Sequence, residues 1–325
     1  MNSYELVSKT IRGENNTGIT PLYAWVFDNV VEAIEKDFGS LHQFEDHYQL
    51  DMAHIFGGPF PYNLNEISRL RASGIEITPE ILLELPMVDP NQMKDYQSVV
   101  GDLNHQKISR ERFCYMQTNG IFECLNEVFG IENHLCYMML NKDALAEVYR
   151  RQAEWNVAFA NNIIDLGMDM IHVSDDWGTQ NSLMFSPASW KELIYPNHKI
   201  LIDAVKARDT FVSLHSDGNI NLVLDGIVEL GYDLIHPYQE SAGMSYDVYL
   251  NKYQDKFALL GGICIQTTLG FGDYQRLESE IRRVFATLKN KRWICCTTHI
   301  VQSHCSIEEL KFAYDLALEL SGKIK

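Results

Sequence analysis

The fold is indicated first by one stretch, Phe211-Val212-Ser213-Leu214-His215-Ser216-Asp217-Gly218-Asn219. It predicts a strand that ends in a polar loop, and this loop leads into a helix over residues 222–230. In parallel α/β proteins, the loop after the carboxyl end of a strand is the usual place of catalytic groups. His215 and Asp217 in this loop can bind a metal or exchange protons. A loop histidine beside an aspartate that caps the next helix is the structural alternative.

The same strand-then-helix unit recurs along the chain. Eight strands are predicted, over residues 19–25, 51–56, 113–118, 168–175, 210–215, 233–239, 257–263 and 293–299. Helical patterns lie between them, chiefly over residues 30–38, 142–166, 187–208, 220–230, 246–253, 274–288 and 306–320. Strands alternating with helices in this number predict a (β/α)8 TIM barrel, as a single domain over residues 1–325. A doubly wound open sheet is the alternative.

One stretch departs from this regular alternation. Residues 57–112 are poorly patterned and too many for a simple loop. We expect them to form an insertion with short helices between the second and third predicted strands. The insertion would fold over one end of the barrel and form part of the pocket.

Strand residues alternate between the two faces of a sheet, and this alternation predicts which polar side chains point into the barrel. The inward-pointing polar residues are, strand by strand, His172, Ser174 and Asp176; Ser213 and His215; and Cys295, Thr297 and His299. Polar groups that rise toward the carboxyl ends of several strands predict one converging active site at the mouth of the barrel. A buried hydrogen-bond network that only stabilises the mouth is the alternative.

Two neighbouring carboxylates, Asp175 and Asp176, end the predicted strand 168–175. Paired carboxylates can divide roles, because a nearby like charge raises one pKa while the other group stays ionised. Adjacent strand residues point to opposite sides, so we expect Asp176 to reach into the barrel and Asp175 to cap a loop. A metal bound by His215 and Asp217 needs a third ligand, for which His299 is the best candidate.

The composition limits the class of protein. A net charge of −17 argues against binding to nucleic acid or to an anionic membrane surface. The seven cysteines are scattered and odd in number, which suits reduced thiols in a cytoplasmic protein better than a disulfide framework. We expect no signal peptide, and no apolar run approaches the roughly 20 residues that span a bilayer. These features favour a cytoplasmic protein with a small-molecule ligand.

Short motifs, densest from Asn119 to Leu318, carry a family resemblance. They are, in order, Gly120-Ile121-Phe122-Glu123, Leu166-Gly167-Met168-Asp169-Met170-Ile171, Asp175-Asp176-Trp177-Gly178-Thr179-Gln180, Phe185-Ser186-Pro187, Tyr195-Pro196, His215-Ser216-Asp217-Gly218, Glu229-Leu230-Gly231-Tyr232-Asp233, Gly261-Gly262-Ile263 and the loop before Ser306-Ile307-Glu308-Glu309. Their order and spacing resemble the uroporphyrinogen decarboxylase superfamily, which includes decarboxylases and cobalamin-linked methyltransferases. The resemblance implies a single (β/α)8 barrel with its site at the C-terminal mouth.

The two branches of this superfamily imply different chemistry. The decarboxylase branch needs no cofactor and holds substrate carboxylates with an Arg-rich segment near the N-terminus, whereas residues 22–29 here contain no Arg. The methyltransferase branch carries zinc on a His-x-Cys pair after the fifth strand and a Cys after the eighth. That zinc activates a substrate thiol for attack on a corrinoid-bound methyl group. This chain keeps His215, has Asp217 in place of the first Cys, and has His299 near the second.

The resemblance therefore implies a metal-dependent, corrinoid-linked methyltransferase that acts on a small substrate. We expect zinc or another divalent metal on His215, Asp217 and His299, with Asp176 and His215 as catalytic residues. The residues expected to bind substrate are Trp177, Gln180, Tyr238 and Gln239. The corrinoid is expected on a partner protein, and a homodimer is one expected assembly.

Two other functions stay open at this point. A metal-free decarboxylase would use Asp176 to stabilise a protonated intermediate and His215 as general acid. A non-catalytic corrinoid or tetrapyrrole binder would show a spectral shift with cobalamin but no turnover. The missing Arg cluster favours the methyltransferase over the decarboxylase.

Overall fold

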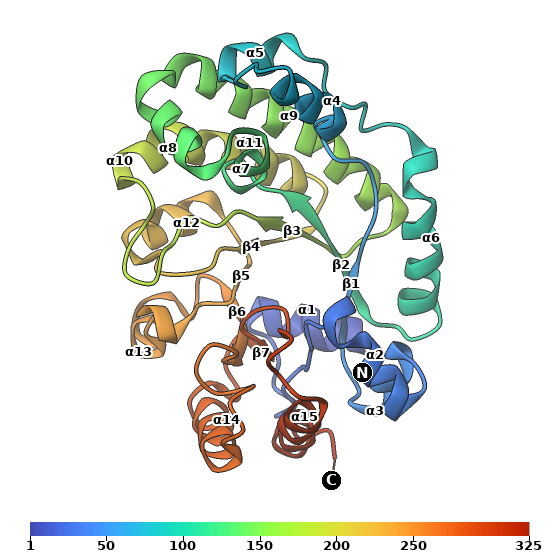
Figure 1. The fold of residues 1–325 in the computed structure, drawn as a ribbon. Coiled ribbons are helices and arrows are strands. Elements are labelled where there is room, and N and C mark those ends of the chain that lie inside the picture. The colour runs from blue at the N-terminus through green and yellow to red at the C-terminus, as the bar shows by residue number, and fades with distance from the viewer. Residues whose placement is uncertain (325) are drawn as a thin grey trace.

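The computed structural model describes residues 1–324, apart from the side chains of residues 28 and 29. Its centre is a sheet of seven parallel strands in sequential order. The strands are β1 (Met52–Ile55), β2 (Phe113–Asn119), β3 (Met170–Ser174), β4 (Phe211–His215), β5 (Leu234–His236), β6 (Ala258–Ile263) and β7 (Trp293–Thr297). The sheet curls, and helices lie around its outside (Figure 1). Seven of the eight predicted strands are thus confirmed.

The remaining predicted strand, residues 19–25, is wrong as a regular strand. It forms only an isolated parallel bridge between Leu22 and Cys295. The amide of Cys295 donates to the Pro21 carbonyl at 3.0 Å, and the Leu22 carbonyl accepts from the Asp51 amide at 2.8 Å. Pro21 has no amide proton to donate, and the amide of Trp25 donates to the side-chain Oγ1 of Thr297 at 3.3 Å, so the ladder does not extend in either direction. The segment nevertheless bonds to β7 on one side and to the residue before β1 on the other.

The helices follow the strands much as the apolar periodicity predicts. The first part of the chain contains α1 (Ser3–Arg12), α2 (Asp28–Phe38), α3 (Leu41–His47), α7 (Glu123–Phe129), α8 (Ile131–Leu140) and α9 (Lys142–Leu166). The second part contains α10 (Pro187–Ser189), η3 (Trp190–Ile194), α11 (Tyr195–Lys206), η4 (Asn221–Val223), α12 (Leu224–Leu230), η5 (Glu240–Ala242), α13 (Tyr246–Val248), η6 (Tyr249–Tyr253), α14 (Tyr274–Leu288) and α15 (Ile307–Ser321). The last helix begins at a serine cap, because Ser306 Oγ accepts the amide of Glu309 at 3.1 Å.

Residues 57–112 contain the expected short helices between β1 and β2. They are α4 (Leu64–Ala72), α5 (Pro79–Glu84), η1 (Met93–Tyr96), α6 (Gln97–Leu103) and η2 (Asn104–Ile108). Figure 1 places α4 and α5 beside α9, and α5 contacts α9 directly. Helix α5 thus packs against α9, and the status of the segment as an insertion that forms part of the pocket stays a prediction.

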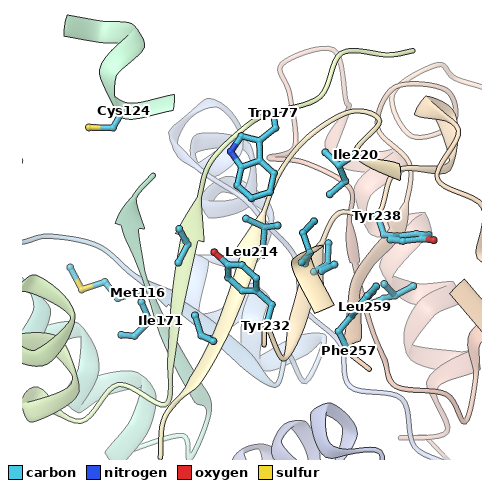
Figure 2. Close-up of a cluster of buried hydrophobic side chains, with 14 of the residues drawn as sticks. Met116, Cys124, Ile171, Trp177, Leu214, Ile220, Tyr232, Tyr238, Phe257 and Leu259 are labelled. Carbon is cyan, nitrogen blue, oxygen red and sulfur yellow. The ribbon is translucent and has the colours of Figure 1, made fainter. Parts of the chain in front are cut away.

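Two apolar cores hold the structure together. The outer core lies between the strands and the surrounding helices, and Figure 2 shows part of it. The inner core lies inside the curled sheet and includes Val7 and Ile11 of α1, which contacts four of the strands. Full burial of one large apolar side chain contributes about 1.5–3 kcal/mol.

Two further findings concern membranes and thiols. Within residues 1–324, no helix is both long and apolar enough to cross a bilayer. All seven cysteines of the chain are free thiols.

Candidate active site

The loops that follow β3 and β4 meet at two glycines. A Cβ added to Gly178 would lie 2.5 Å from the carbonyl oxygen of Asp217, and one added to Gly218 (φ +77°) would lie 2.5 Å from that of Thr179. Any larger residue would push the loops apart. The amide of Asp217 also donates to Asp176 Oδ1 at 2.7 Å. This close approach brings the carboxylates of Asp176 and Asp217 to one place.

Four predicted site residues converge at this point. His215 Nε2 lies 3.6 Å from Asp176 Oδ1 and 4.0 Å from Asp217 Oδ1. His299 Nε2 lies 3.5 Å from the other carboxylate oxygen of Asp217, Oδ2. Asp217 Oδ1 is buried and accepts no hydrogen bond. We call Asp176, His215, Asp217 and His299 the mouth cluster.

His299 reaches the mouth cluster by another route than strand alternation predicts. Within β7, Cys296 lies in the inner core, whereas Cys295 lies in the outer core. β7 ends at Thr297, and the backbone bends at residues 298–300. The prediction that Cys295 and Thr297 share the inward face with His299 is therefore wrong, because the alternation stops where the strand stops.

Glu123, at the start of α7, lies next to the mouth cluster, although the sequence analysis assigned it no role. Its Oε2 accepts a hydrogen bond from Ser174 Oγ at 3.0 Å. Burial, followed by the charges of Asp176 and Asp175, raises the pKa of Glu123 to about 7. Its place directly after β2 was the available signal, because loops at the carboxyl ends of parallel strands carry functional groups.

The electrostatics of the mouth cluster are those of crowded, buried acids. Burial, followed by the charges of Asp176 and Glu123, raises the pKa of Asp217 to about 8. Burial also raises the pKa of Asp176. Burial, followed by the charge of His299, lowers the pKa of His215 to about 3, so this ring is neutral. In the described part of the chain, no Lys or Arg pairs with these carboxyl groups. The site therefore favours a proton or a cation between them.

Asp175 is fully buried and has a structural role, unlike its neighbour Asp176. Its Oδ1 accepts the amides of Phe122 and Glu123 at 2.9 and 2.7 Å, at the start of α7. Its Oδ2 lies 2.7 Å from His198 Nε2. These contacts agree with the expected capping role. They also fix the helix that carries Glu123.

Two of the predicted substrate-binding side chains do not reach the mouth cluster. Trp177 and Tyr238 point into the outer core, where Figure 2 labels both. The hydroxyl of Tyr238 donates to the carbonyl of Ser245 at 3.2 Å. The structure thus does not bring Trp177 and Tyr238 to the mouth cluster, and their role in substrate binding stays a prediction. Gln180 is exposed in the turn after β3, and its role stays a prediction.

A cavity of about 560 Å³ opens beside the mouth cluster and includes the predicted residue Gln239. Its lining residues are Asp217, Gln239, Ile265, Gln266, Gly270, Phe271, His299, Gln302 and His304. Gln239 is held in place because its Oε1 accepts the amide of Gly218 at 3.1 Å and its Nε2 donates to Gln266. A second cavity, of about 380 Å³, lies beside Glu123. Both cavities give a small ligand access to the carboxyl groups.

Beneath the mouth cluster, imidazole rings surround Trp25 inside the curled sheet. His172, His215 and His236 each present a ring nitrogen within 4.8 Å of the other two. The ring of His54 lies 6.3 Å from that of His172, centroid to centroid. Burial lowers the pKa of all four rings, which are therefore neutral. His54 and His236 were not among the predicted site residues, although both lie within predicted strands, over residues 51–56 and 233–239.

The donor set of the mouth cluster fits a divalent metal. Asp176, His215 and Asp217 present three ligand atoms within 4.8 Å of one another. Imidazole and carboxylate ligands suit zinc and several other divalent metals. The buried, unpartnered Oδ1 of Asp217 is an oxygen that a cation would satisfy. The three buried histidines fit less well, because Nδ1 of His215 and Nδ1 of His236 are hydrogen-bonded to each other at 2.8 Å.

Comparisons with known proteins agree with this architecture. A search of curated proteins finds no match. A methyltransferase from Methanosarcina mazei is similar in structure, with a TM-score of 0.69 and 12% identity over 98% of this chain and 99% of that one. A B12-independent methionine synthase from Shewanella sp. W3-18-1, in complex with selenomethionine, has a TM-score of 0.52 and 11% identity over 94% and 93% of the two chains. At these identities the likeness shows the fold alone.

The sequence itself identifies the family. The family model described as uroporphyrinogen decarboxylase (URO-D) matches residues 103–320, which is more than half of the chain. This region runs from the end of α6 into α15 and contains the mouth cluster, Glu123 and the buried histidines His172, His215 and His236, but not His54. The chain therefore belongs to the uroporphyrinogen decarboxylase family.

Proposed function

We propose that this protein is a metal-dependent methyltransferase that moves a methyl group between a small substrate and a corrinoid carried by a partner protein. The observation that carries the proposal is the convergence of Asp176, His215 and Asp217 within 4.8 Å at the mouth of the barrel. The methyltransferase neighbours on the same fold support it. One of these neighbours is named as B12-independent, so the corrinoid is the part of the proposal that most needs a test.

His215, Asp217 and His299 would hold the metal, with Asp176 as a further ligand. A bound divalent metal lowers the pKa of a substrate thiol or hydroxyl and so makes it a better nucleophile. The side chains around the metal would have different roles. Glu123, with a pKa of about 7, can take up and release a proton near neutral pH. Gln239 offers a fixed amide at the wall of the larger cavity.

The cavity walls favour an uncharged or cationic small substrate. The larger cavity is lined by one acidic side chain, Asp217, and its lining residues include no Lys or Arg. A substrate with several carboxylates would lose its hydration there without gaining a bidentate partner. This is the argument against uroporphyrinogen itself as substrate. The predicted cytoplasmic location and homodimer stay predictions.

The first test is the metal content of the purified protein, measured by elemental mass spectrometry after zinc is supplied and excess is removed. We expect about one equivalent in the wild type and a loss of it in His215→Ala. His304→Ala is the matched control, because His304 lines the same cavity but lies outside the mouth cluster. No bound metal in the wild type, or equal loss in both variants, would refute the metal site.

The second test is methyl transfer itself. Purified protein loaded with zinc is incubated with methylcobalamin and a panel of small thiols, and demethylation is followed by the absorbance change of the corrinoid. Transfer that requires His215 supports the proposal. A spectral shift without transfer would instead indicate a corrinoid binder.

A metal-free decarboxylase is the second candidate, because one observation favours it. The raised pKa values of Asp217 and Glu123, about 8 and about 7, keep carboxyl protons available near neutral pH. A protonated acid of this kind could deliver a proton to the carbon that loses carbon dioxide. Release of carbon dioxide from uroporphyrinogen by chelator-treated protein would establish this candidate over the first.

A further inference from the structure

A chain of hydrogen bonds runs from the backbone of β7 to the mouth cluster. His236 Nε2 lies 3.1 Å from the carbonyl oxygen of Thr297. The other nitrogen of that ring, Nδ1, lies 2.8 Å from Nδ1 of His215. The two rings are stacked at a centroid distance of 5.0 Å and an interplanar angle of 25°. His236 is 1% exposed and His215 is 4% exposed, so both rings are fixed inside the barrel.

The direction of each hydrogen bond follows from the Thr297 carbonyl, which can only accept. A carbonyl oxygen only accepts, so Nε2 of His236 carries a proton and donates it to Thr297. A neutral imidazole holds one proton, which leaves Nδ1 of His236 as an acceptor. The partner at 2.8 Å, Nδ1 of His215, must then be the donor. The second nitrogen of His215, Nε2, is left with a free lone pair.

We propose that His236 is a positioning residue, which takes its tautomer from the Thr297 carbonyl and thereby fixes His215 as the Nδ1–H tautomer. The lone pair of His215 Nε2 then faces Asp176 Oδ1 at 3.6 Å and Asp217 Oδ1 at 4.0 Å. With Asp176 and Asp217 ionised all three atoms are acceptors, so the site favours a cation or a shared proton between them. Metal-binding histidines commonly use their second nitrogen in this way, with a backbone carbonyl or carboxylate as partner. Here a second histidine, His236, stands between the Thr297 carbonyl and the metal-binding histidine.

The consequence for metal affinity rests on the proposed function, whereas the tautomer itself does not. In the opposite tautomer, His215 Nε2 would carry a proton and could not act as a metal ligand. Loss of an outer hydrogen-bond partner typically weakens metal binding about 10- to 100-fold. His236 would thus affect the mouth cluster without contacting substrate or metal.

The test compares three replacements of His236 in the metal-free, chelator-treated protein. His236→Asn places an amide oxygen near the position of Nδ1 and keeps an acceptor for His215. His236→Phe removes both hydrogen bonds at similar size. His236→Gln keeps a donor toward Thr297 but places no acceptor opposite His215, and it serves if the Phe variant does not fold. His172→Phe is the matched control, because His172 is equally buried but bonds to Ser213 at 2.6 Å instead.

The first readout is the ring-nitrogen NMR spectrum of ¹⁵N-histidine-labelled protein, with the His215 signals assigned by their loss in His215→Gln. We expect the Nδ1–H tautomer of His215 in the wild type, His236→Asn and His172→Phe, and its loss in His236→Phe and His236→Gln. The second readout is zinc affinity against a competing chelator, which should fall about 10- to 100-fold in the same two variants.

Retention of the Nδ1–H tautomer in folded His236→Phe or His236→Gln would overturn the proposal. Equal loss in His172→Phe would overturn it too, because the effect would then be one of general packing. If the wild type binds no zinc, the proposed function fails, and the NMR readout still decides the role of His236.

Discussion

The two ends of the space inside the curled sheet are built on the same strands, yet their side chains differ in polarity. Near the amino ends the inward side chains are apolar, and two residues further along the same face they are imidazoles. The pairs are Met52 and His54 on β1, Met170 and His172 on β3, and Leu234 and His236 on β5. The apolar end is covered by α1, whereas the polar end meets the loops that form the mouth cluster.

Within one strand, the residues at the amino end thus contribute to stability, and the residues at the carboxyl end position the groups of the candidate site. Apolar burial at the lower end stabilises the fold without constraining any proton. At the upper end each buried polar group needs a hydrogen-bond partner, and the partners fix which nitrogen or oxygen faces the mouth. Inside the curled sheet, the buried imidazoles therefore lie at the end where hydrogen-bond partners are present, next to the mouth cluster.

Phe113→Ala should break the lower end. Phe113 is fully buried and packs on Phe211 at a centroid distance of 5.8 Å. Truncation of a buried Phe lowers the free energy of unfolding by about 3–5 kcal/mol, because it leaves a cavity. Urea denaturation measures the loss. Zinc bound per folded molecule should not change, and a parallel loss of zinc affinity would contradict the separation of roles between the two ends.

Asp175→Ala and Asp176→Ala should separate two neighbouring carboxylates at the upper end. Removing Asp175 leaves the start of α7 and His198 without their buried partner, which lowers the free energy of unfolding by about 3 kcal/mol. Removing Asp176 should change the unfolding free energy by about 1 kcal/mol or less but weaken zinc binding. Thermal unfolding and zinc titration of both variants distinguish the roles. Reversed results would show that Asp175, not Asp176, serves the metal.

Asp217→Asn should remove a pH dependence from the metal-free protein. The pKa of Asp217 rises from an ordinary value of 3.8 to about 8 in the folded state. The folded chain then keeps a proton that the unfolded chain releases, so stability falls as the pH rises from about 4 through 8. The Asn variant should lack this fall and be about 1–3 kcal/mol more stable than the wild type at pH 8. Chelator-treated protein is compared by urea denaturation at pH 5 and pH 8, and parallel pH profiles would reject the raised pKa.

Tyr238→Phe should have the smallest effect. The change removes one hydroxyl that donates to the Ser245 carbonyl and leaves the packed ring in place. A hydrogen bond of this kind contributes about 1 kcal/mol to stability. Methyl transfer, with its KM for the substrate, should stay at the wild-type value. A raised KM in this variant would indicate that the Tyr238 hydroxyl binds substrate.

The sequence carried most of the fold because its signals are local. The apolar periodicities predicted α9 and α14 at the bounds that the structure has, and seven of the eight strands. The eighth prediction, residues 19–25, was wrong because Pro21 lacks an amide proton and the amide of Trp25 donates to the Thr297 side chain, which leaves a single bridge. Inside the strands, alternation correctly placed His172, Ser213 and His215 on one face. Beyond the strand ends alternation gives no direction for side chains such as Trp177 and Tyr238, because loop residues have no fixed period.

By itself, the sequence determined the strands, the helices, the family and the inward position of His215, since each depends on local pattern or on short motifs. Which acidic side chains lie close together depends on the tertiary structure. Glu123, Asp176 and Asp217 follow three different strands, and their pKa values are raised because folding buries them together. The relay from Thr297 through His236 to His215 likewise joins three strands. Burial and mutual distance are properties of the packed chain, and no local pattern of residues encodes them.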